Sequence, residues 1–189
     1  MPLTNFINTL MEFVNSLVRN TKPMLLKAEE IINGCGVFDA EHVMLINLIN
    51  AIHKLLKEGR KEDAKRIFKE GLVAYTEKHL SHEEEVMEKY GYPELEKHKK
   101  AHEVFKKVIS EDMNKLDDAK AFAAEAALAM GWVFGHIRKS DRKYVEWFKE
   151  KGCWSEACEE LEKPVRLGIE GELREILGEE FVELRNLKG

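Results

Sequence analysis

The sequence has few residues that would break or cross-link a helical fold. Its 189 residues include only 4 Pro and 3 Cys, and Gln is absent. An odd number of cysteines without zinc-type spacing is expected of a reducing compartment and argues against a disulfide scaffold. The longest apolar runs, 43–52 and 126–135, are about ten residues long, whereas a membrane-spanning helix needs about 20. The first residues do not resemble a secretory signal, so we expect a cytoplasmic protein.

The charge balance is slightly acidic. The 35 acidic residues outnumber the 30 basic ones and give a formal net charge of -5. This leaves no basic field for phosphate backbones, and we see no local basic patch, so we expect no nucleic-acid partner. The high content of Glu, Lys, Ala and Leu favours helix over strand. The length suits one core with about 40 residues of appendage.

Four long segments carry helical periodicity. We predict helices at about 40–57, 61–89, 94–116 and 118–151, with Asp39 as the N-cap of the first and Gly59 at its end. Because loops of about two to five residues join these helices, they should form an up-down-up-down antiparallel four-helix bundle. An extra amphipathic helix at 3–18 and helices within 155–187 flank this unit. We therefore expect an all-α fold with an N-terminal arm (1–37), the bundle (38–151) and a helical C-terminal extension (152–189).

Five of the seven histidines fall on the apolar faces of these segments. His98 and His102 are four residues apart and lie one above the other on the third helix, and His79 and Glu83 repeat this spacing on the second. His42 lies on the first helix and His136 on the fourth. Every helix thus directs an imidazole inward. The inward carboxylate of Glu83 is costly to bury unless it is paired or bound to metal.

A further carboxylate, Asp141, follows His136 by five residues, which is roughly 140° around an ideal helix. Both side chains can reach one site only if the helix is locally distorted or a bridging ligand takes the longer reach. Five imidazoles and two carboxylates would leave many buried polar groups without partners, and metal would supply those partners.

Ligand type alone does not choose the metal, because imidazole suits iron, zinc, copper and nickel. Seven ligands exceed the needs of one tetrahedral zinc. They suit two octahedrally inclined ions that share two bridging carboxylates and leave one position open. The sequence lacks the Glu-x-x-His motif of ferritin-like di-iron sites and the His-Glu-x-x-His motif of zinc proteases, which counts against both classes.

Three stretches follow one known family pattern in order and spacing. They are FDAEHVMLINLIN around His42, YTEKHLSHEEEVMEKYGYPELEKHKKAHEVF from His79 to Phe105, and WVFGHIRKSDRKY around His136 and Asp141. Residues 38–148 in this way resemble the hemerythrin family in its prokaryotic single-domain form. The resemblance implies two non-haem irons, bridged by Glu83, Asp141 and an oxo or hydroxo group. It assigns one iron to His98, His102 and His136, and the other to His42 and His79.

The resemblance also implies that dioxygen binds reversibly, as hydroperoxide, at a vacant position of the two-histidine iron. By position, we expect Leu45, Phe105 and Val133 to wall the oxygen pocket, with Trp132 and Tyr144 behind them. Imidazole ligands disfavour highly oxidised iron, and an apolar pocket offers no proton donor to cleave the O–O bond, so we expect binding rather than turnover. The expected function is an oxygen carrier, store or scavenger. Two alternatives stay open, namely a redox enzyme that reduces peroxide or nitric oxide, and an oxygen or redox sensor that acts through the terminal extensions.

Some features match no ligand position or depart from the family. Glu41 precedes His42 where Gln is common, and His82 is expected to face solvent or a neighbour. Cys153 and Cys158 are either two ordinary thiols on a short helix or a redox-sensitive pair that reports to a partner. The first helix and an apolar stripe beyond Pro164 are candidates for homodimer or protein contacts; the stripe comprises Leu167, Ile169, Leu173, Ile176 and Leu177.

Overall fold

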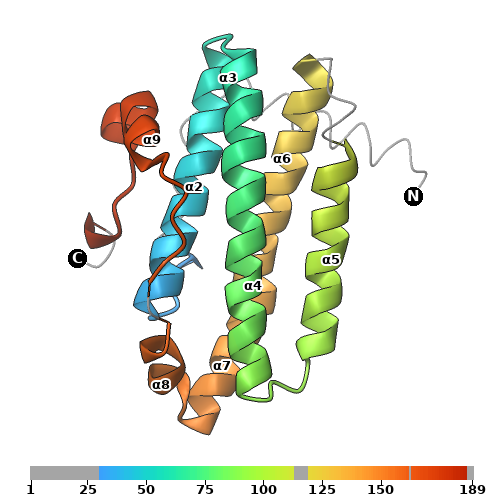
Figure 1. The fold of residues 1–189 in the computed structure, drawn as a ribbon, viewed down its shortest axis with the longest axis vertical. Coiled ribbons are helices and arrows are strands. Elements are labelled where there is room, and N and C mark those ends of the chain that lie inside the picture. The colour runs from blue at the N-terminus through green and yellow to red at the C-terminus, as the bar shows by residue number, and fades with distance from the viewer. Residues whose placement is uncertain (1–29, 113–118, 162, 187–189) are drawn as a thin grey trace.

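The computed structural model describes residues 30–112, 119–161 and 163–186. Within these ranges all regular secondary structure is helical, as the sequence predicts. The predicted helix at 3–18 lies outside the described residues. Figure 1 shows the helices α2, α4, α5 and α6 side by side in a bundle, with contacts between α2 and α4, α4 and α5, and α5 and α6.

The first helix of the bundle, α2, spans Gly36–Lys57 and begins four residues before the predicted start. The prediction of Asp39 as its N-cap is wrong, because Cys35 occupies that position with an extended backbone. Asp39 lies inside the helix, where its carboxylate accepts hydrogen bonds from the backbone N–H groups of Asn33 (2.8 Å) and Gly34 (3.3 Å). At the other end, Gly59 takes the left-handed conformation that ends helices.

The next predicted helix, 61–89, is present as three consecutive elements. α3 spans Lys61–Arg66, a π-helical stretch (η2) spans Ile67–Val73, and α4 spans Ala74–Lys89. Within η2, Gly71 lies so close to α2 that a Cβ atom there would stand 2.7 Å from Cδ2 of Leu48. A larger residue at this position would require the Leu48 side chain to shift.

The remaining two bundle segments complete the framework of the site. α5 spans Leu95–Asp112. The predicted helix 118–151 is present as α6 (Ala119–His136), a π-helical turn η4 (Ile137–Asp141) and α7 (Arg142–Lys151). Helical periodicity thus located all of these segments but did not locate the π-helical stretch in the second.

Two apolar clusters fill the bundle. The larger one contains the edge-to-face pair of Phe68 and Phe122, whose ring centroids are 5.5 Å apart. The smaller one gathers aromatic side chains at the end of the bundle that carries α7, among them Phe38, Tyr144 and Trp154. The buried histidines contact aromatic rings of both clusters.

The C-terminal extension folds back along the bundle. It consists of α8 (Trp154–Glu159), α9 (Glu170–Leu177) and the short 3-10 turns η5 (Gly178–Glu180) and η6 (Leu184–Asn186). Figure 1 shows α9 beside α2. The buried Asn47 of α2 exchanges two hydrogen bonds, both 2.9 Å long, with the backbone of Val182.

The apolar stripe beyond Pro164, a candidate for homodimer or protein contacts, packs within the chain instead. Leu173 and Leu177 are fully buried in the larger cluster, and Leu167, Ile169 and Ile176 pack against it. The reason is that α9 presents this face to α2. Among the described helices, none combines the length and the apolar character needed to cross a membrane.

Candidate metal centre

Three imidazoles converge between α5 and the end of α6. His98 and His102 are one turn apart on α5, and His136 is the last residue of α6. The Nε2 atom of His136 lies 2.8 Å from Nε2 of His102 and 3.1 Å from Nε2 of His98. Oε2 of Glu83, from α4, lies 3.5 Å and 3.6 Å from the Nε2 atoms of His102 and His98. All four side chains are buried.

The π-helical turn η4 adds Asp141 to this group. Hydrogen bonds in a π-helix connect residues five apart, so such residues share one face. His136 and Asp141 are related in this way, and Nε2 of His136 lies 3.1 Å from Oδ1 of Asp141. The helix is therefore distorted at the position where the spacing of these two residues requires it.

Two further imidazoles form a second group. His42 projects from α2 and His79 from α4, with ring centroids 5.1 Å apart. Nε2 of His79 lies 3.7 Å from Oε1 of Glu83. In this group, one ligand atom from each of His42, His79 and Glu83 lies within 4.8 Å of the other two. In the other group, one ligand atom from each of the three histidines and from Glu83 lies within 4.8 Å of the rest. Glu83 is thus common to a two-histidine group and a three-histidine group.

Acceptors outside the cluster fix the orientation of three of these rings. The Nδ1–H groups donate from His42 to the Ile31 carbonyl (2.6 Å), from His79 to Oε2 of Glu41 (2.7 Å), and from His102 to Oε1 of Glu84 (2.7 Å). In a neutral ring with its proton on Nδ1, the lone pair of Nε2 is directed into the cluster. A carbonyl or carboxylate behind a histidine is the usual arrangement at metal sites.

Glu41 connects the cluster to the C-terminal extension. This carboxylate is fully buried, and its Oε1 atom accepts hydrogen bonds of 2.9 Å from His82 Nδ1 and from the backbone N–H of Val165. The expected neighbour of His82 is therefore Glu41. From the sequence, Glu41 was noted only as a departure from the family, and Glu84 was missed. Glu41 directly precedes the predicted ligand His42, and Glu84 directly follows the predicted ligand Glu83.

The buried charges favour a cation. Burial, together with the neighbouring His79, lowers the pKa of His42, so this ring is neutral. Burial would raise the pKa of Glu83, but His79, His102 and His98 outweigh it and hold the pKa well below its usual value. Burial would lower the pKa of His79, but the carboxylates of Glu83 and Glu41 raise it to about 9.

Several buried polar atoms of the cluster lack a hydrogen-bond partner among the described residues. They are Nε2 of His42, Oε2 of Glu83 and both carboxylate oxygens of Asp141. Each buried polar group without a partner lowers the free energy of unfolding by about 1–3 kcal/mol. Neighbouring ligands about 2.1 Å from one octahedral ion lie about 3.0 Å apart, which is close to the 2.8 Å and 3.1 Å separations of the three Nε2 atoms. The donor set and its spacing thus fit a metal ion.

Aromatic side chains surround the three-histidine group. Trp132 stacks on His136 at 4.4 Å and on Phe105 at 3.9 Å, with interplanar angles of 13° and 5°. The buried Tyr144 donates a hydrogen bond of 2.9 Å to Oε1 of Glu83. Leu45 and Val133 are buried in the larger apolar cluster.

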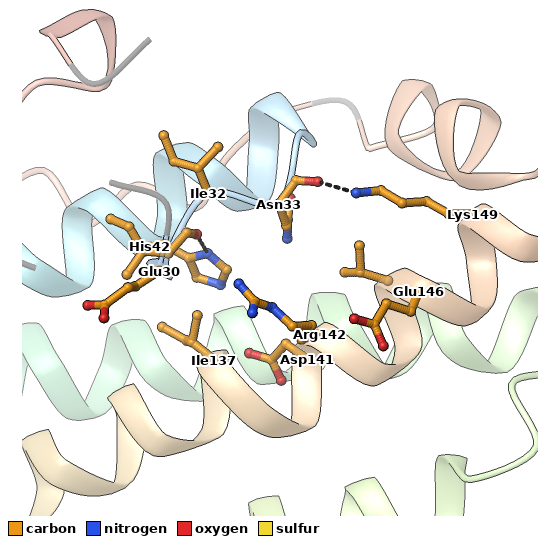
Figure 2. Close-up of a pocket in the computed structure, with 11 residues that line it drawn as sticks. Glu30, Ile32, Asn33, His42, Ile137, Asp141, Arg142, Glu146 and Lys149 are labelled. Carbon is orange, nitrogen blue, oxygen red and sulfur yellow. Dashed lines mark hydrogen bonds between the residues drawn. The ribbon is translucent and has the colours of Figure 1, made fainter. Parts of the chain in front are cut away.

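A cavity of about 150 Å³ connects the cluster with the surface, and Figure 2 shows it. Its inner part is lined by the buried His42 and Asp141, and the exposed side chains of Arg142, Glu146 and Lys149 lie at its outer part. The remaining wall is formed by Ile137, Val145 and the segment 30–33 before α2. None of the five residues expected at the oxygen pocket lines this cavity.

Comparison with known proteins decides the family. The family model described as hemerythrin HHE cation binding domain matches residues 33–148. The chain belongs to the hemerythrin family. Hemerythrin domains imply non-haem iron, and the buried His/Glu cluster fits a metal site of that kind. The C-terminal extension, including α8 and α9, lies beyond the matched hemerythrin residues.

Curated hemerythrin relatives cover the same region. The chain is 30% identical over 127 residues to the bacteriohemerythrin of Stenotrophomonas maltophilia (strain R551-3), which covers 67% of this chain and 82% of the relative. It is 32% identical over 123 residues to that of Pseudomonas aeruginosa (strain LESB58), covering 65% and 80%. The bacteriohemerythrin of Clostridium acetobutylicum is 30% identical over 129 residues, covering 65% of this chain and 100% of the relative. No solved structure matches the chain significantly.

Proposed function

We propose that this hemerythrin holds two iron ions and binds dioxygen reversibly, as a carrier, store or local scavenger of oxygen. The observation that carries the proposal is the position of Glu83, whose carboxylate belongs to both histidine groups. A carboxylate between two groups of imidazoles is suited to bridge two metal ions. When ferrous iron is bound, the pair supplies and recovers the two electrons that reversible dioxygen binding needs.

The proposed ligands divide unequally between the two ions. Glu83 and Asp141 are shared, and an oxo or hydroxo group completes the bridge. His98, His102 and His136 serve one ion, which then has five protein ligands, whereas His42 and His79 serve the other, which has four. The two-histidine side therefore keeps a position open for dioxygen. The cavity that reaches His42 and Asp141 supports this assignment, because it offers a route to that side.

The surrounding residues favour binding over turnover. Leu45, Phe105 and Val133 are buried and apolar, and we propose that they exclude water from the bound oxygen. Tyr144 directs its O–H to Glu83, and burial together with Glu83 and Asp141 raises its pKa well above the usual value. Tyr144 therefore keeps its proton. We also propose the up-down-up-down order of the four segments and the division into residues 1–37, 38–151 and 152–189.

The spectrum of the iron-loaded protein tests the proposed function. The protein would be reduced without oxygen, exposed to oxygen and then returned to argon while its visible absorption is recorded. A charge-transfer band that appears with oxygen and disappears under argon is the expected result. Conversion to a stable diferric spectrum on first exposure would contradict reversible binding and favour a redox enzyme.

A sensor is the second candidate, and one specific contact favours it. The backbone N–H of Val165 in the C-terminal extension donates to Glu41, which in turn holds His79. A change at the two-histidine side could thereby reach the extension. Limited proteolysis of the oxygenated and reduced protein should then cut the extension at different rates, and equal rates would leave the carrier as the better account.

A further inference from the structure

Three free cysteines lie at the end of the bundle away from the loop between α2 and α3. Cys35 precedes α2 and is fully buried, Cys153 precedes α8, and Cys158 lies within α8. Both Cys153 and Cys158 are partly accessible to solvent. The sequence suggested a pairing of these last two, but they are five residues apart on one short element, which places them on different faces of a helix.

The packing of α8 on α2 brings Cys158 to Cys35 instead. Figure 1 shows α8 next to the N-terminal end of α2. The rings of Phe38 and Trp154 stack there, with centroids 6.3 Å apart and planes inclined by 16°. Cys35 precedes Phe38 by three residues and Cys158 follows Trp154 by four, so each cysteine shares a face with one of the stacked rings.

The two cysteines are neighbours in the fold. Cys35 is buried in the smaller apolar cluster and Cys158 packs against that cluster, and a side-chain hydrogen bond joins the two thiols. Cys153 has a different neighbour, because its Sγ lies 3.7 Å from the carbonyl oxygen of Phe148. The contact between Cys35 and Cys158 joins two segments that are far apart in the sequence, and for this reason sequence spacing could not reveal it.

The environment of the pair separates the two thiols chemically. The hydrogen bond from Cys158 lowers the pKa of Cys35 despite its burial, and the backbone N–H groups of Phe38 and Val37 lower it further. The same hydrogen bond, together with burial, raises the pKa of Cys158. Of the two thiols, Cys35 therefore ionises first, while Cys158 keeps its proton and donates it toward the Cys35 sulfur.

We propose that Cys35 and Cys158 form a redox-active dithiol that hydroperoxides oxidise to an intramolecular disulfide. In the first step the Cys35 thiolate attacks hydrogen peroxide, the O–O bond breaks, an S–O bond forms, and the departing hydroxide takes a proton from Cys158 and leaves as water. In the second step the Cys158 sulfur attacks the sulfenic acid of Cys35, the S–O bond breaks, the S–S bond forms, and a second water leaves. The two thiols together lose two electrons and two protons, and one hydrogen peroxide becomes two waters.

The disulfide would fasten the extension to the segment that leads into the metal centre. Ile31, whose carbonyl accepts the hydrogen bond from His42, lies four residues before Cys35. The pairing does not depend on the proposed binding of dioxygen, because its oxidant is a hydroperoxide from solvent and not dioxygen at the metal centre.

Thiol counting and peptide mapping on the full-length, metal-loaded protein test the proposal. Treatment with hydrogen peroxide at a small molar excess should remove two of the three thiols and link the tryptic peptide of Cys35 to that of Cys158. Cys153→Ser is the matched control and should still lose two thiols and form the same link. Cys35→Ser and Cys158→Ser should form no intramolecular link.

Other outcomes would overturn the pairing. These are a Cys153–Cys158 link, a disulfide between chains, or three intact thiols in the treated wild-type protein. A measurement on the unmodified protein covers the case in which a serine variant fails to fold. Oxidised wild type should melt about 5–15 °C higher than the reduced form, because the disulfide constrains the unfolded chain, and an unchanged melting temperature would contradict the proposed link.

Discussion

The two halves of the metal centre are built in different ways. In the three-histidine half the ring centroids are 4.4, 4.6 and 4.7 Å apart, and His102 is held from behind by Glu84. In the two-histidine half the ring centroids are 5.1 Å apart, and each ring is held from behind by Ile31 or Glu41. Of the five histidines, His42 alone lines the cavity, which also reaches the shared Asp141. The half with the wider ring spacing is thus also the one whose histidine lines the cavity, and it depends on Ile31, which precedes α2.

Glu83→Ala should abolish the distinction between the halves, because it removes the carboxylate that both share. We expect iron content to fall from about two per chain to below about 0.5, since loss of a shared ligand weakens both sites. Elemental analysis of the purified protein measures this. Glu85→Ala, at an exposed position on the same helix, is the control and should retain the iron; equal iron in both variants would show that Glu83 is not a ligand.

The dependence of metal binding on pH should separate the halves. In the metal-free protein the pKa of His79 is raised to about 9, and bound metal must displace that proton. The affinity of the two-histidine half should therefore rise with pH by up to about tenfold per unit between pH 6.5 and 9. Anaerobic titration with Fe²⁺ or Co²⁺ at several pH values measures this, and a flat profile for both halves would refute the assignment.

The loss of the His79 proton at high pH also implies a change in the free energy of unfolding of the metal-free protein. A folded-state pKa above the unfolded value of about 6.5 means that protonated His79 stabilises the fold below that pH. This contribution should be lost as the pH rises through about 9. Urea unfolding of the metal-free protein at pH 6.5 and 9.5 measures the loss, and His79→Ala should remove the difference.

Two glutamates behind the histidines allow each half to be weakened separately. Glu41→Gln should lower the affinity of the two-histidine half by about 10–100-fold, and Glu84→Gln should do the same for the three-histidine half. Each substitution keeps the shape of the side chain and removes its charge. Chelator competition measures both affinities. If the two variants lose the same metal ion, the assignment of Glu41 and Glu84 to different halves is wrong.

Tyr144→Phe should produce the smallest effect and should not distinguish the halves. It removes the O–H that donates to the shared Glu83 and leaves a buried carboxylate oxygen without that partner. We expect the metal-free protein to lose about 1–3 kcal/mol of stability. Thermal unfolding with and without metal provides the test, and a selective loss of one iron would contradict the shared role of Glu83.

The sequence predicted the features that depend on local spacing. His98 and His102 follow the four-residue helical repeat. The five-residue step from His136 to Asp141 predicted either a distorted helix or a longer reach through a bridging ligand, and the structure has the distortion, as η4. The N-cap of α2 was wrong because Asp39 is used instead to bind the loop that precedes the helix. The predicted N-terminal helix at 3–18 stays a prediction.

Features that depend on contacts between distant segments could not be predicted. Val165 reaches Glu41 from the other end of the chain, and the cavity combines the segment 30–33 with α7. The contact of Cys35 with Cys158 arises only because α8 packs on α2. Periodicity and motif spacing carry no information about how an extension folds back on a bundle.

Mössbauer spectroscopy of the ⁵⁷Fe-loaded diferric protein tests the central claim most directly. Two irons with five and four protein ligands, joined by shared carboxylates, predict two quadrupole doublets of equal area and a diamagnetic ground state at low temperature. A single doublet, or the magnetic spectrum of isolated ferric ions, would contradict a bridged centre with two unequal halves.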